Sequence, residues 1–579
     1  MAKSSRKKRN GAERLQGSPS KAGEARTGFW RRHLTGAFGQ AGLGVLLLWV
    51  ALPPVGWWPL AFVAPLSWIV LIRRKELPGK RPYRAIWLAG FLFWLAELYW
   101  MTMPHPSTSL GWIALSAYLA ILLPLFVGLS RVAVHRLGIS VVAAAPVVWT
   151  GLELIRGYFW GGFTMASLGH VIYRWTAMIQ TADLAGAYAV GFVVMFLAAC
   201  SGRQIRLQED ERRPLWPAVA GLLMLGAALA YGYGRMAQAK EEPALRVALI
   251  QGSTDITLDM GFEKKKEMHD EHMRLTLETV AKDPSIELVM WPESTFFDDI
   301  LSYERGAPAP WWWRGTEEDF LQRFPAYAEE TRRQVGEAAQ EVGVPMLVGL
   351  TRRNYKARGE AVYNTAVLVT KSDEQSNDYD KMQMYDKIHL VMFGEYFPLS
   401  DKLEFLYRFT PVNTLSIGLQ AGKKPVAFDL DGLSLAPNIC YESVVPQVIR
   451  RQVTELKAAE KEPDILVNLT NDGWFFGSNA LDLHMICGVF RAVECRKPFL
   501  IAANTGLSAW IDGNGRIRKE GPRLATGAIV ADVSKDERRS LYLWWGDLPA
   551  ALCLLCCVAL AAIGMVNRPC RSSVCGAQG

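Results

Sequence analysis

Long apolar runs dominate the first 234 residues of the chain, and one more lies near its end. A helix needs about 20 apolar residues to cross the hydrocarbon core of a bilayer. Eight runs approach that length, at about residues 36–53, 55–72, 85–103, 110–134, 139–158, 176–200, 214–233 and 543–565. This pattern predicts a polytopic α-helical membrane domain with about eight transmembrane helices.

Residues 235–540 show a different pattern, with short apolar runs between turns and amphipathic stretches. These runs predict β-strands near residues 246–251, 287–291, 344–349, 361–370, 433–440 and 464–469. The mixed spacing of residues 263–282 predicts an amphipathic helix, and the turn-rich segment 354–359 predicts an antiparallel hairpin. Strands that alternate with helices and hairpins are typical of a layered α/β sandwich.

Positive charges in the loops indicate the orientation, because Lys and Arg are retained on the cytoplasmic side of a membrane. Such clusters flank the first, second, sixth and eighth apolar runs, and all four fall on one side if eight segments cross. The predicted order is a disordered basic cytoplasmic arm (1–30), a transmembrane domain of about seven helices (31–234), an extracytoplasmic α/β domain (235–540), a C-terminal transmembrane helix (541–566) and a cytoplasmic tail (567–579).

The net charge of +8 could indicate nucleic-acid binding, but its distribution does not. The cations concentrate in the N-terminal arm and in short loops beside apolar runs, which is a topology signal. We therefore expect a membrane location and no nucleic-acid partner. The first apolar run begins far from Met1 and is followed by others, which argues against a cleavable signal peptide.

Nine cysteines are too unevenly placed to form a disulfide framework. Only Cys440, Cys487 and Cys495 fall in the α/β domain, and this odd number hints at a functional free thiol there. The cluster at 553–557 lies in a membrane-like stretch with no histidine or carboxylate nearby, so we expect no metal site there.

Three reactive side chains stand at or just past predicted strands: Glu293, Lys387 and Cys440. A thiol of ordinary pKa is mostly protonated near neutral pH, so a carboxylate base is needed to make it a nucleophile. A lysine can then stabilise the oxyanion of a tetrahedral intermediate, together with the backbone N–H of Tyr441. Each residue alone would more commonly be a surface or packing residue; the local sequence around all three makes the combination informative.

Three sequence blocks resemble the signatures of the carbon-nitrogen hydrolase (nitrilase) superfamily. They are WPES at 291–294, YDKIHL at 385–390 with FGEYFP at 393–398, and NICYE at 438–442. The resemblance implies a four-layer αββα sandwich with Glu293 as base, Lys387 as oxyanion partner and Cys440 as nucleophile. It also implies that Glu395 supports the lysine and that Tyr441 and Glu442 are associated with substrate access. From the residues alone, Glu442 could simply cap a helix, and Tyr441 could contribute only its amide.

A fourth block narrows the resemblance to one branch, the apolipoprotein N-acyltransferases. It comprises NLTNDGWF at 468–475, His484, RAVE at 491–494 and ANTG at 503–506, with seven apolar runs before the domain and one after it. The sequence departs from the branch at Met392, where proline is common, and at Ser253. A tryptophan often found after the first strand is absent, and the stretch between Glu293 and Lys387 is longer than usual.

The resemblance implies a two-step reaction without a cofactor. Cys440 would take an acyl group from a phospholipid, typically phosphatidylethanolamine, as a thioester. The N-terminal amine of a diacylglyceryl-cysteine on an apolipoprotein would then accept it, as the last step of lipoprotein maturation. This implies a multi-pass protein of the bacterial inner membrane with its catalytic domain on the periplasmic side. The alternatives are a membrane-tethered amidase that hydrolyses its acyl-enzyme and a non-catalytic lipid-binding or transport protein.

Two further features bear on how lipid is held. Polar residues in or near the apolar runs are candidates for lining a lipid pocket, or they pair to hold helices together: Glu97, Glu153, Arg156 and His170. The tryptophans 311–313 lie inside the long stretch. They either dip into the membrane interface and guide lipid, or form a local hydrophobic cluster under a loop.

Overall fold

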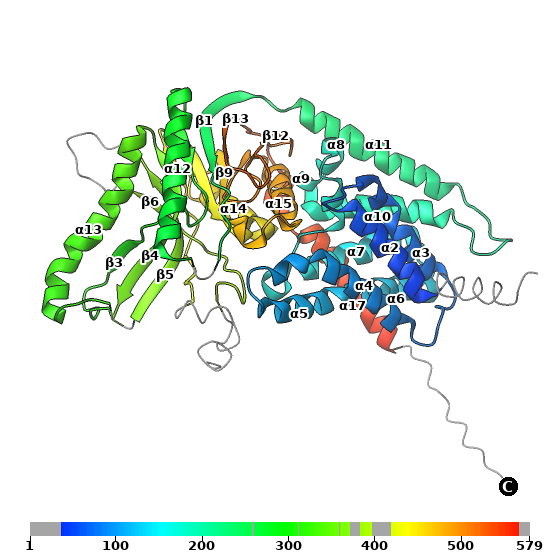
Figure 1. Ribbon diagram of the computed structural model, residues 1–579. Coiled ribbons are helices and arrows are strands. Elements are labelled where there is room, and N and C mark those ends of the chain that lie inside the picture. Colours follow the sequence, from blue (N-terminus) through cyan, green and yellow to red (C-terminus); the bar gives the residue numbers. More distant parts are fainter. Residues whose placement is uncertain are drawn as a thin grey trace, which may run out of the picture.

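The computed structural model describes residues 36–257, 260–310, 312–357, 359–370, 382–396 and 418–566. The predicted N-terminal arm and C-terminal tail lie outside these residues. Figure 1 shows a domain of packed helices beside an α/β domain, with the C-terminal helix α17 returning to the helical domain. The α/β domain begins near residue 240, and the chain returns to the helical domain after residue 540; the predicted domain bounds and membrane sides stay predictions.

Helices occupy all eight predicted apolar runs. They are α2 (Ala37–Ala51), α3 (Ala64–Arg73), α4 (Pro82–Glu97), α5 (Thr108–Ala120), α6 (Leu122–Arg136), α7 (Val141–Tyr158), α10 (Ala187–Arg203), α11 (Trp216–Ala237) and α17 (Leu548–Val566). Among the described residues, three helical stretches are long and apolar enough to cross a membrane: Thr108–Arg136, Trp216–Ala237 and Leu548–Val566. The apolar helices at Ala37–Ala51, Trp58–Arg73 and Ala187–Arg203 are shorter.

The run at 176–200 differs most from its prediction as one continuous span. It contains two short helices, α8 (Thr176–Ile179) and α9 (Ala182–Ala185), and only then the longer α10. Gly186 separates α9 from α10 with a φ of 70°, a conformation that glycine adopts without steric cost. Apolarity alone does not reveal this break, because apolar residues lie directly on both sides of it.

The C-terminal helix α17 packs closely against α7. A side chain at Gly151 of α7 would place its Cβ 2.8 Å from the Cys553 carbonyl carbon, so only glycine permits this approach. At the other end of α17, Arg136 donates to the carbonyl oxygen of Ile563 at 3.0 Å. The last helix is thus an integral part of the helical domain.

The α/β domain contains two mixed sheets. The first has the order β13-β1-β2-β4-β5-β6, with β3 also paired to β4, and the second has the order β12-β11-β10-β9-β8-β7. The first sheet comprises β1 (Glu242–Gln251), β2 (Leu288–Met290), β3 (Ile300–Tyr303), β4 (Met346–Lys356), β5 (Gly359–Val369), β6 (Gln383–Asp386) and β13 (Gly527–Lys535). The second comprises β7 (Phe428–Leu430), β8 (Leu433–Ile439), β9 (Ile465–Thr470), β10 (Phe499–Ala503), β11 (Ala509–Ile511) and β12 (Ile517–Glu520).

The six predicted strands and the predicted helix are confirmed, with the helix at α12 (Phe262–Lys282). The predicted hairpin is also confirmed, because β4 and β5 pair antiparallel out to Lys356 opposite Gly359. Alternating side chains of these strands enter different cores, as a two-residue period requires. In β1, Val247 and Leu249 join the core that both sheets share, whereas Ala248 and Ile250 face the opposite side.

Helices cover the outer face of each sheet. On the first sheet these are α12 and α13 (Glu317–Val342), and on the second they are α14 (Pro446–Ala458) and α15 (Ala480–Cys495). One hydrophobic core continues from α14 and α15 into the helical domain. In Figure 1, these two helices accordingly lie between the second sheet and the membrane-type helices.

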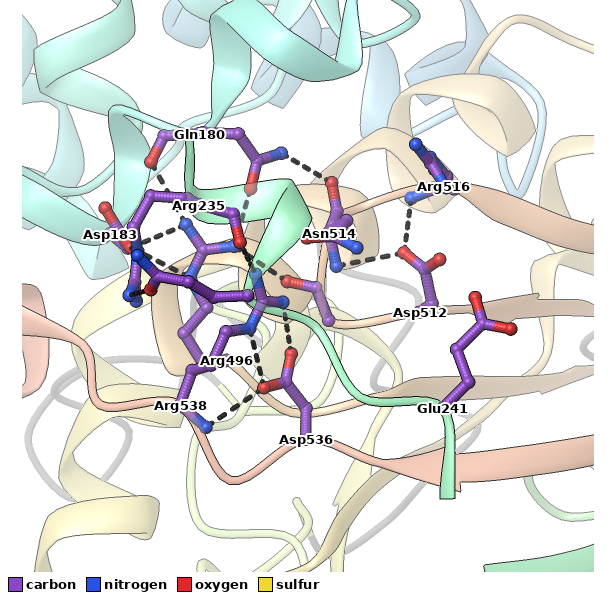
Figure 2. Close-up of polar contacts among 12 residues, drawn as sticks. Gln180, Asp183, Arg235, Glu241, Arg496, Asp512, Asn514, Arg516, Asp536 and Arg538 are labelled. Atoms are coloured by element: carbon purple, nitrogen blue, oxygen red, sulfur yellow. Dashed lines mark hydrogen bonds and ion pairs between the residues drawn. The ribbon is translucent and has the colours of Figure 1, made fainter. Parts of the chain in front are cut away.

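A buried ionic cluster also joins the domains, as Figure 2 shows. Asp183 accepts hydrogen bonds from Arg496 at 2.5 and 2.8 Å, from Arg235 at 2.8 Å and from Tyr231 at 2.5 Å. Arg496 directly follows α15, whereas Asp183 belongs to α9 of the helical domain, and both are buried. We call these residues, Asp183, Tyr231, Arg235 and Arg496, the interdomain clasp.

Candidate active site

The three candidate residues follow strands of the two facing sheets. Glu293 comes after β2, Lys387 directly after β6, and Cys440 directly after β8. Lys387 Nζ lies 3.6 Å from Glu293 Oε1, and both charges act on the Cys440 thiol. The structure thus brings together three residues separated by up to 147 positions (440 − 293) in the sequence. We call Glu293, Lys387 and Cys440 the candidate triad.

Lys387 is fully buried between two carboxylates. Its Nζ donates to Glu395 Oε1 at 2.6 Å, the position predicted for a supporting glutamate, in addition to the 3.6 Å approach to Glu293. Burial lowers the pKa of Lys387, but Glu395 and Glu293 outweigh burial and raise that pKa above its usual value. The lysine therefore carries a positive charge at any working pH, as oxyanion stabilisation requires.

Glu293 accepts hydrogen bonds from two donors that were not predicted from the sequence. Its Oε1 accepts from Asn364 of β5 at 2.6 Å, and its Oε2 accepts from the backbone N–H of Asn471 at 3.0 Å. Burial raises the pKa of Glu293 above its usual value, while Lys387 and these donors act in the opposite direction. A carboxyl group with a raised pKa is suited to both accept and return a proton.

Cys440 begins a short 3₁₀ turn, Cys440–Val444, with a φ of 51°. A left-handed conformation is uncommon for a residue other than glycine and occurs preferentially at functional sites. Burial and the charge of Glu293 raise the pKa of the Cys440 thiol well above its usual value, while Lys387 lowers it. The resting thiol is therefore protonated, and a nearby base has to remove the proton. Of the cysteines described in the α/β domain, Cys487 and Cys495 are buried, whereas Cys440 keeps some exposure.

Glu442 connects the turn of the nucleophile to the loop of the lysine. Its two carboxylate oxygens accept from the backbone N–H groups of Ile388, His389 and Ile439 at 2.7 to 2.9 Å, and from the hydroxyl of Tyr385 at 2.9 Å. The contact with Ile439 N–H is the capping role considered from the sequence. Since Glu442 is fully buried and occupied by these donors, the arrangement indicates a positioning role.

Tyr441 faces the helical domain. Its hydroxyl donates to the carbonyl oxygen of Gly162 at 2.6 Å, and its ring stacks on His389 with centroids 6.2 Å apart. His389 Nε2 in turn donates to the carbonyl oxygen of Gly161 at 2.8 Å. The side chain of Tyr441 therefore links the candidate nucleophile's turn to the loop after α7, beyond any use of its amide.

The polar residues predicted within or near the apolar runs are buried close to the α/β domain. They are Glu97, Glu153, Arg156 and His170. Glu97 Oε1 accepts from Asn479 at 3.0 Å, just before α15, and the His170 ring lies 4.6 Å from the Phe490 ring of α15. Within the helical domain, Glu153 accepts from the N–H of Leu168 at 3.0 Å. These contacts favour the interpretation that the group holds elements together, and lipid lining stays a prediction.

The tryptophan cluster forms part of a local hydrophobic core. Trp312 and Trp313 pack with Phe320 and Phe324 of α13, and Trp312 donates to Tyr355 at 3.1 Å. The remaining tryptophan, at 311, lies outside the described residues. Figure 1 shows α13 at the side of the α/β domain farthest from the helical domain. This position supports the local-cluster interpretation over lipid guidance, because it is remote from the helices that are apolar enough to enter a bilayer.

The departure at Met392 falls in a tight turn. Met392 forms a β-bridge with Tyr396, and the backbone N–H groups of Gly394 and Glu395 donate to the carbonyl oxygen of Val391. Val391 N–H donates back to Glu395 Oε2 at 2.8 Å. This turn orients Glu395 toward the lysine with methionine at the position where proline is common.

Residues 246–542, which include nearly all of the two sheets and the three side chains at strand ends, match the family described as carbon-nitrogen hydrolase. Residues 44–200 match a second family, described as the apolipoprotein N-acyltransferase N-terminal domain. Curated relatives match over most of their length. An apolipoprotein N-acyltransferase from Rhodopirellula baltica is 31% identical, covering 88% of this chain and 93% of the relative. The chain belongs to the apolipoprotein N-acyltransferase family.

A second relative agrees with this assignment. The apolipoprotein N-acyltransferase from Geobacter metallireducens is 30% identical, covering 91% of this chain and 95% of the relative. Among solved structures, an amidase from Nesterenkonia sp. aligns with a TM-score of 0.34 and 16% identity, covering 52% of this chain and 96% of the amidase. The family assignment depends on the sequence matches, which confirm the resemblance found in the four blocks.

Proposed function

We propose that this chain transfers a fatty acyl group from a phospholipid to the N-terminal amine of a diacylglyceryl-cysteine on an apolipoprotein. The observation that carries the proposal is the candidate triad, with Lys387 buried between two carboxylates, in a domain that shares its core with apolar helices. The acyl donor and acceptor are both lipids anchored in a membrane. Attachment to apolar helices keeps such an enzyme where its substrates are.

In the first half-reaction, Glu293 takes the proton of the Cys440 thiol, and the thiolate attacks an ester carbonyl of the donor. The tetrahedral oxyanion is stabilised by the Lys387 ammonium and the N–H of Tyr441. When the ester C–O bond breaks, Glu293 gives its proton to the leaving alkoxide. The products are a lysophospholipid and a thioester on Cys440.

In the second half-reaction, the neutral amine of the acceptor attacks the thioester. Such an α-amine has a pKa of about 7.7–8, so a substantial neutral fraction exists near neutral pH. Glu293 accepts the proton that the amine loses, and the proton returns to the Cys440 sulfur as the C–S bond breaks. An amide is more stable than a thioester, so the transfer needs neither a nucleotide nor another cofactor.

The finer predictions belong to the same proposal. We infer phosphatidylethanolamine as the donor, eight membrane crossings and a four-layer αββα sandwich on the periplasmic side of a bacterial inner membrane. The loop charges support the crossings and their orientation, and the two sheets with helices on their outer faces support the sandwich; the donor is carried over from the family resemblance. The shorter helices would cross as parts of a packed domain, in which neighbouring helices cover their ends.

The test uses the full-length protein in detergent with radiolabelled phosphatidylethanolamine. We expect an acyl adduct that hydroxylamine removes and that Cys440→Ser abolishes. The matched control is Cys556→Ser, which changes an exposed thiol of α17 and should retain the adduct. Absence of an adduct in the unmodified protein would contradict the proposal.

A diacylated lipopeptide added to the labelled protein separates the proposal from its rival. We expect the label to move to the lipopeptide as a hydroxylamine-resistant amide. Release as free fatty acid alone would favour the membrane-tethered hydrolase instead, since the same triad can transfer the acyl group to water.

A further inference from the structure

A chain of buried polar side chains lies beneath the Cys440 turn. The carbonyl oxygen of Cys440 accepts from Ser443 Oγ at 3.1 Å, from Asn468 Nδ2 at 3.2 Å and from His484 Nε2 at 3.1 Å. These three side chains are almost completely buried and come from the turn itself, from β9 and from α15. The left-handed backbone of Cys440 is thus held from below by three donors.

The other ring nitrogen of His484 faces a carboxylate. Nδ1 lies 3.0 Å from Asp472 Oδ1, and Thr470 Oγ1 also donates to that oxygen at 3.1 Å. Asp472 belongs to the short 3₁₀ turn Asp472–Phe475, which follows Asn471, the residue whose N–H holds Glu293. The two ring nitrogens of His484 therefore connect the surroundings of the base to the backbone of the nucleophile.

The partners of the two nitrogens determine the protonation of the ring. A neutral imidazole donates from one nitrogen only, and its other nitrogen is an acceptor. Here the Asp472 carboxylate faces Nδ1, and Nε2 faces both the carbonyl oxygen of Cys440 at 3.1 Å and the hydroxyl oxygen of Ser443 at 2.9 Å. The single proton of Ser443 Oγ is donated to the Cys440 carbonyl, so in this arrangement Ser443 Oγ accepts from Nε2. The imidazolium, with a proton on each nitrogen, then satisfies all three contacts of the ring.

We propose that His484 is a positioning residue for the nucleophile, held as an imidazolium by Asp472. Its Nε2–H fixes the carbonyl of Cys440, and its positive charge offsets the negative charge of Asp472 beneath the thiol. The inference rests on the proposed role of Cys440 as nucleophile. Its test is independent of lipid turnover, because thiol reactivity is measured without substrate.

The electrostatics agree with this geometry. Burial lowers the pKa of His484, but Asp472 outweighs burial, and the net effect is a pKa above the usual value. The groups that act on the ring are the carboxylates of Asp472 and Glu293 and the backbone carbonyl of Cys440. Asp472 also raises the pKa of the Cys440 thiol. A proton on His484 therefore favours the thiolate by opposing that effect.

The experiment measures alkylation of Cys440 by iodoacetamide as a function of pH, followed by mass spectrometry of the Cys440 peptide. In His484→Gln, an amide N–H replaces the Nε2 donor, but the charge of Asp472 is no longer offset. We expect the midpoint of Cys440 alkylation to rise by about 1 pH unit or more, a tenfold change at a fixed pH below the midpoint.

A double variant separates this effect from packing. His484→Gln with Asp472→Asn removes both charges, so we expect the midpoint to return toward that of the unmodified protein. His269→Leu is the matched control, since it changes a buried histidine packed among Trp291, Phe296 and Phe297, and it should leave the midpoint unchanged.

Two results would overturn the inference: an unchanged midpoint in His484→Gln, or no recovery in the double variant. If His484→Gln alone does not fold, the double variant decides the question. Recovery of a folded protein with normal Cys440 reactivity supports the charge pairing, and failure to recover contradicts it.

Discussion

At the scale of single residues, the protonation of Glu293 controls when the proposed nucleophile can form. Its carboxyl group must be ionised to take the thiol proton, and burial raises its pKa. Activity is therefore expected to fall as the pH falls through this raised value, above the range usual for glutamate. Asn364 opposes the shift, because its amide donates to Glu293 Oε1 at 2.6 Å and favours the ionised form.

Asn364→Leu should move the acidic limb of thioester formation to higher pH. Losing one hydrogen bond to a carboxylate corresponds to about 1 pH unit. The measurement is the rate of hydroxylamine-sensitive labelling between pH 4 and 8. Asn354→Leu, in the same hairpin but beside Glu304, is the control and should keep the original profile. An unshifted limb in Asn364→Leu would mean that this contact does not tune the base.

The residues of the candidate triad could be predicted from the sequence, whereas most of their partners could not. Glu293, Lys387 and Cys440 each lie in a short block with a recognisable order of residues. Asn364 lies in the middle of strand β5, outside any recognisable sequence block. Its hydrogen bond to Glu293 arises only because the strands of the first sheet pair side by side. Asp472 and His484 were part of a recognised block, but the contacts of His484 with Asp472 and with the Cys440 carbonyl depend on how α15 packs.

At the scale of elements, the turn Cys440–Val444 and the loop after β6 act as one unit through Glu442. Four donors converge on its two oxygens. Three of them are backbone N–H groups, so the carboxylate joins the main chains of the two segments directly. This unit fixes the distance between the proposed nucleophile and the lysine.

Glu442→Gln should destabilise this unit, because the new amide N–H₂ faces groups that are themselves donors. An unsatisfied buried group costs about 1–3 kcal/mol. We expect a lower Tm and slower thioester formation, measured by thermal unfolding in detergent and by labelling. Glu455→Gln on the exposed side of α14 should change neither quantity. Equal Tm values for the two variants would show that Glu442 does not hold this unit together.

Six of the thirteen strands in the described residues were predicted from the sequence, whereas β3, β6, β7, β10, β11, β12 and β13 were not. Alternation and flanking turns locate β1 and β5 to within a few residues, since each strand faces two different environments, but β4 continues to Lys356, seven residues beyond its predicted end at 349. The prediction of one continuous span over residues 176–200 was wrong. The break at Gly186 has apolar residues on both sides, so the apolar pattern continues across it. Its cause is contact with the α/β domain: Glu494 of α15 accepts from the N–H of Ala187 at 2.8 Å.

At the scale of the whole molecule, the interdomain clasp resists separation of the two domains. Arg496 is fully buried, and Asp183 provides its carboxylate partner, while Gln180 and Gly513 accept its remaining donors. Removing one member of a buried ion pair leaves a charge without compensation, which is more damaging than losing a surface pair.

Asp183→Asn should therefore lower the stability by about 3–5 kcal/mol, because it leaves two arginines without their carboxylate. The readout is the Tm in detergent together with the protease sensitivity of the two domains. Asp532→Asn removes an exposed partner of Arg246 and should have little effect. The clasp would be unimportant for docking if both variants unfolded at the same temperature.

The burial of α15 has a consequence for attempts to divide the protein. Every residue of this helix except Asp482 is buried, and much of that burial comes from the helical domain. In an excised α/β fragment, the face of α15 that packs against the helical domain would become an exposed apolar surface prone to aggregation. Truncation to the α/β domain would thus expose and destabilise the helix that supports the thiol, so biochemical work should begin from the intact chain in lipid or detergent.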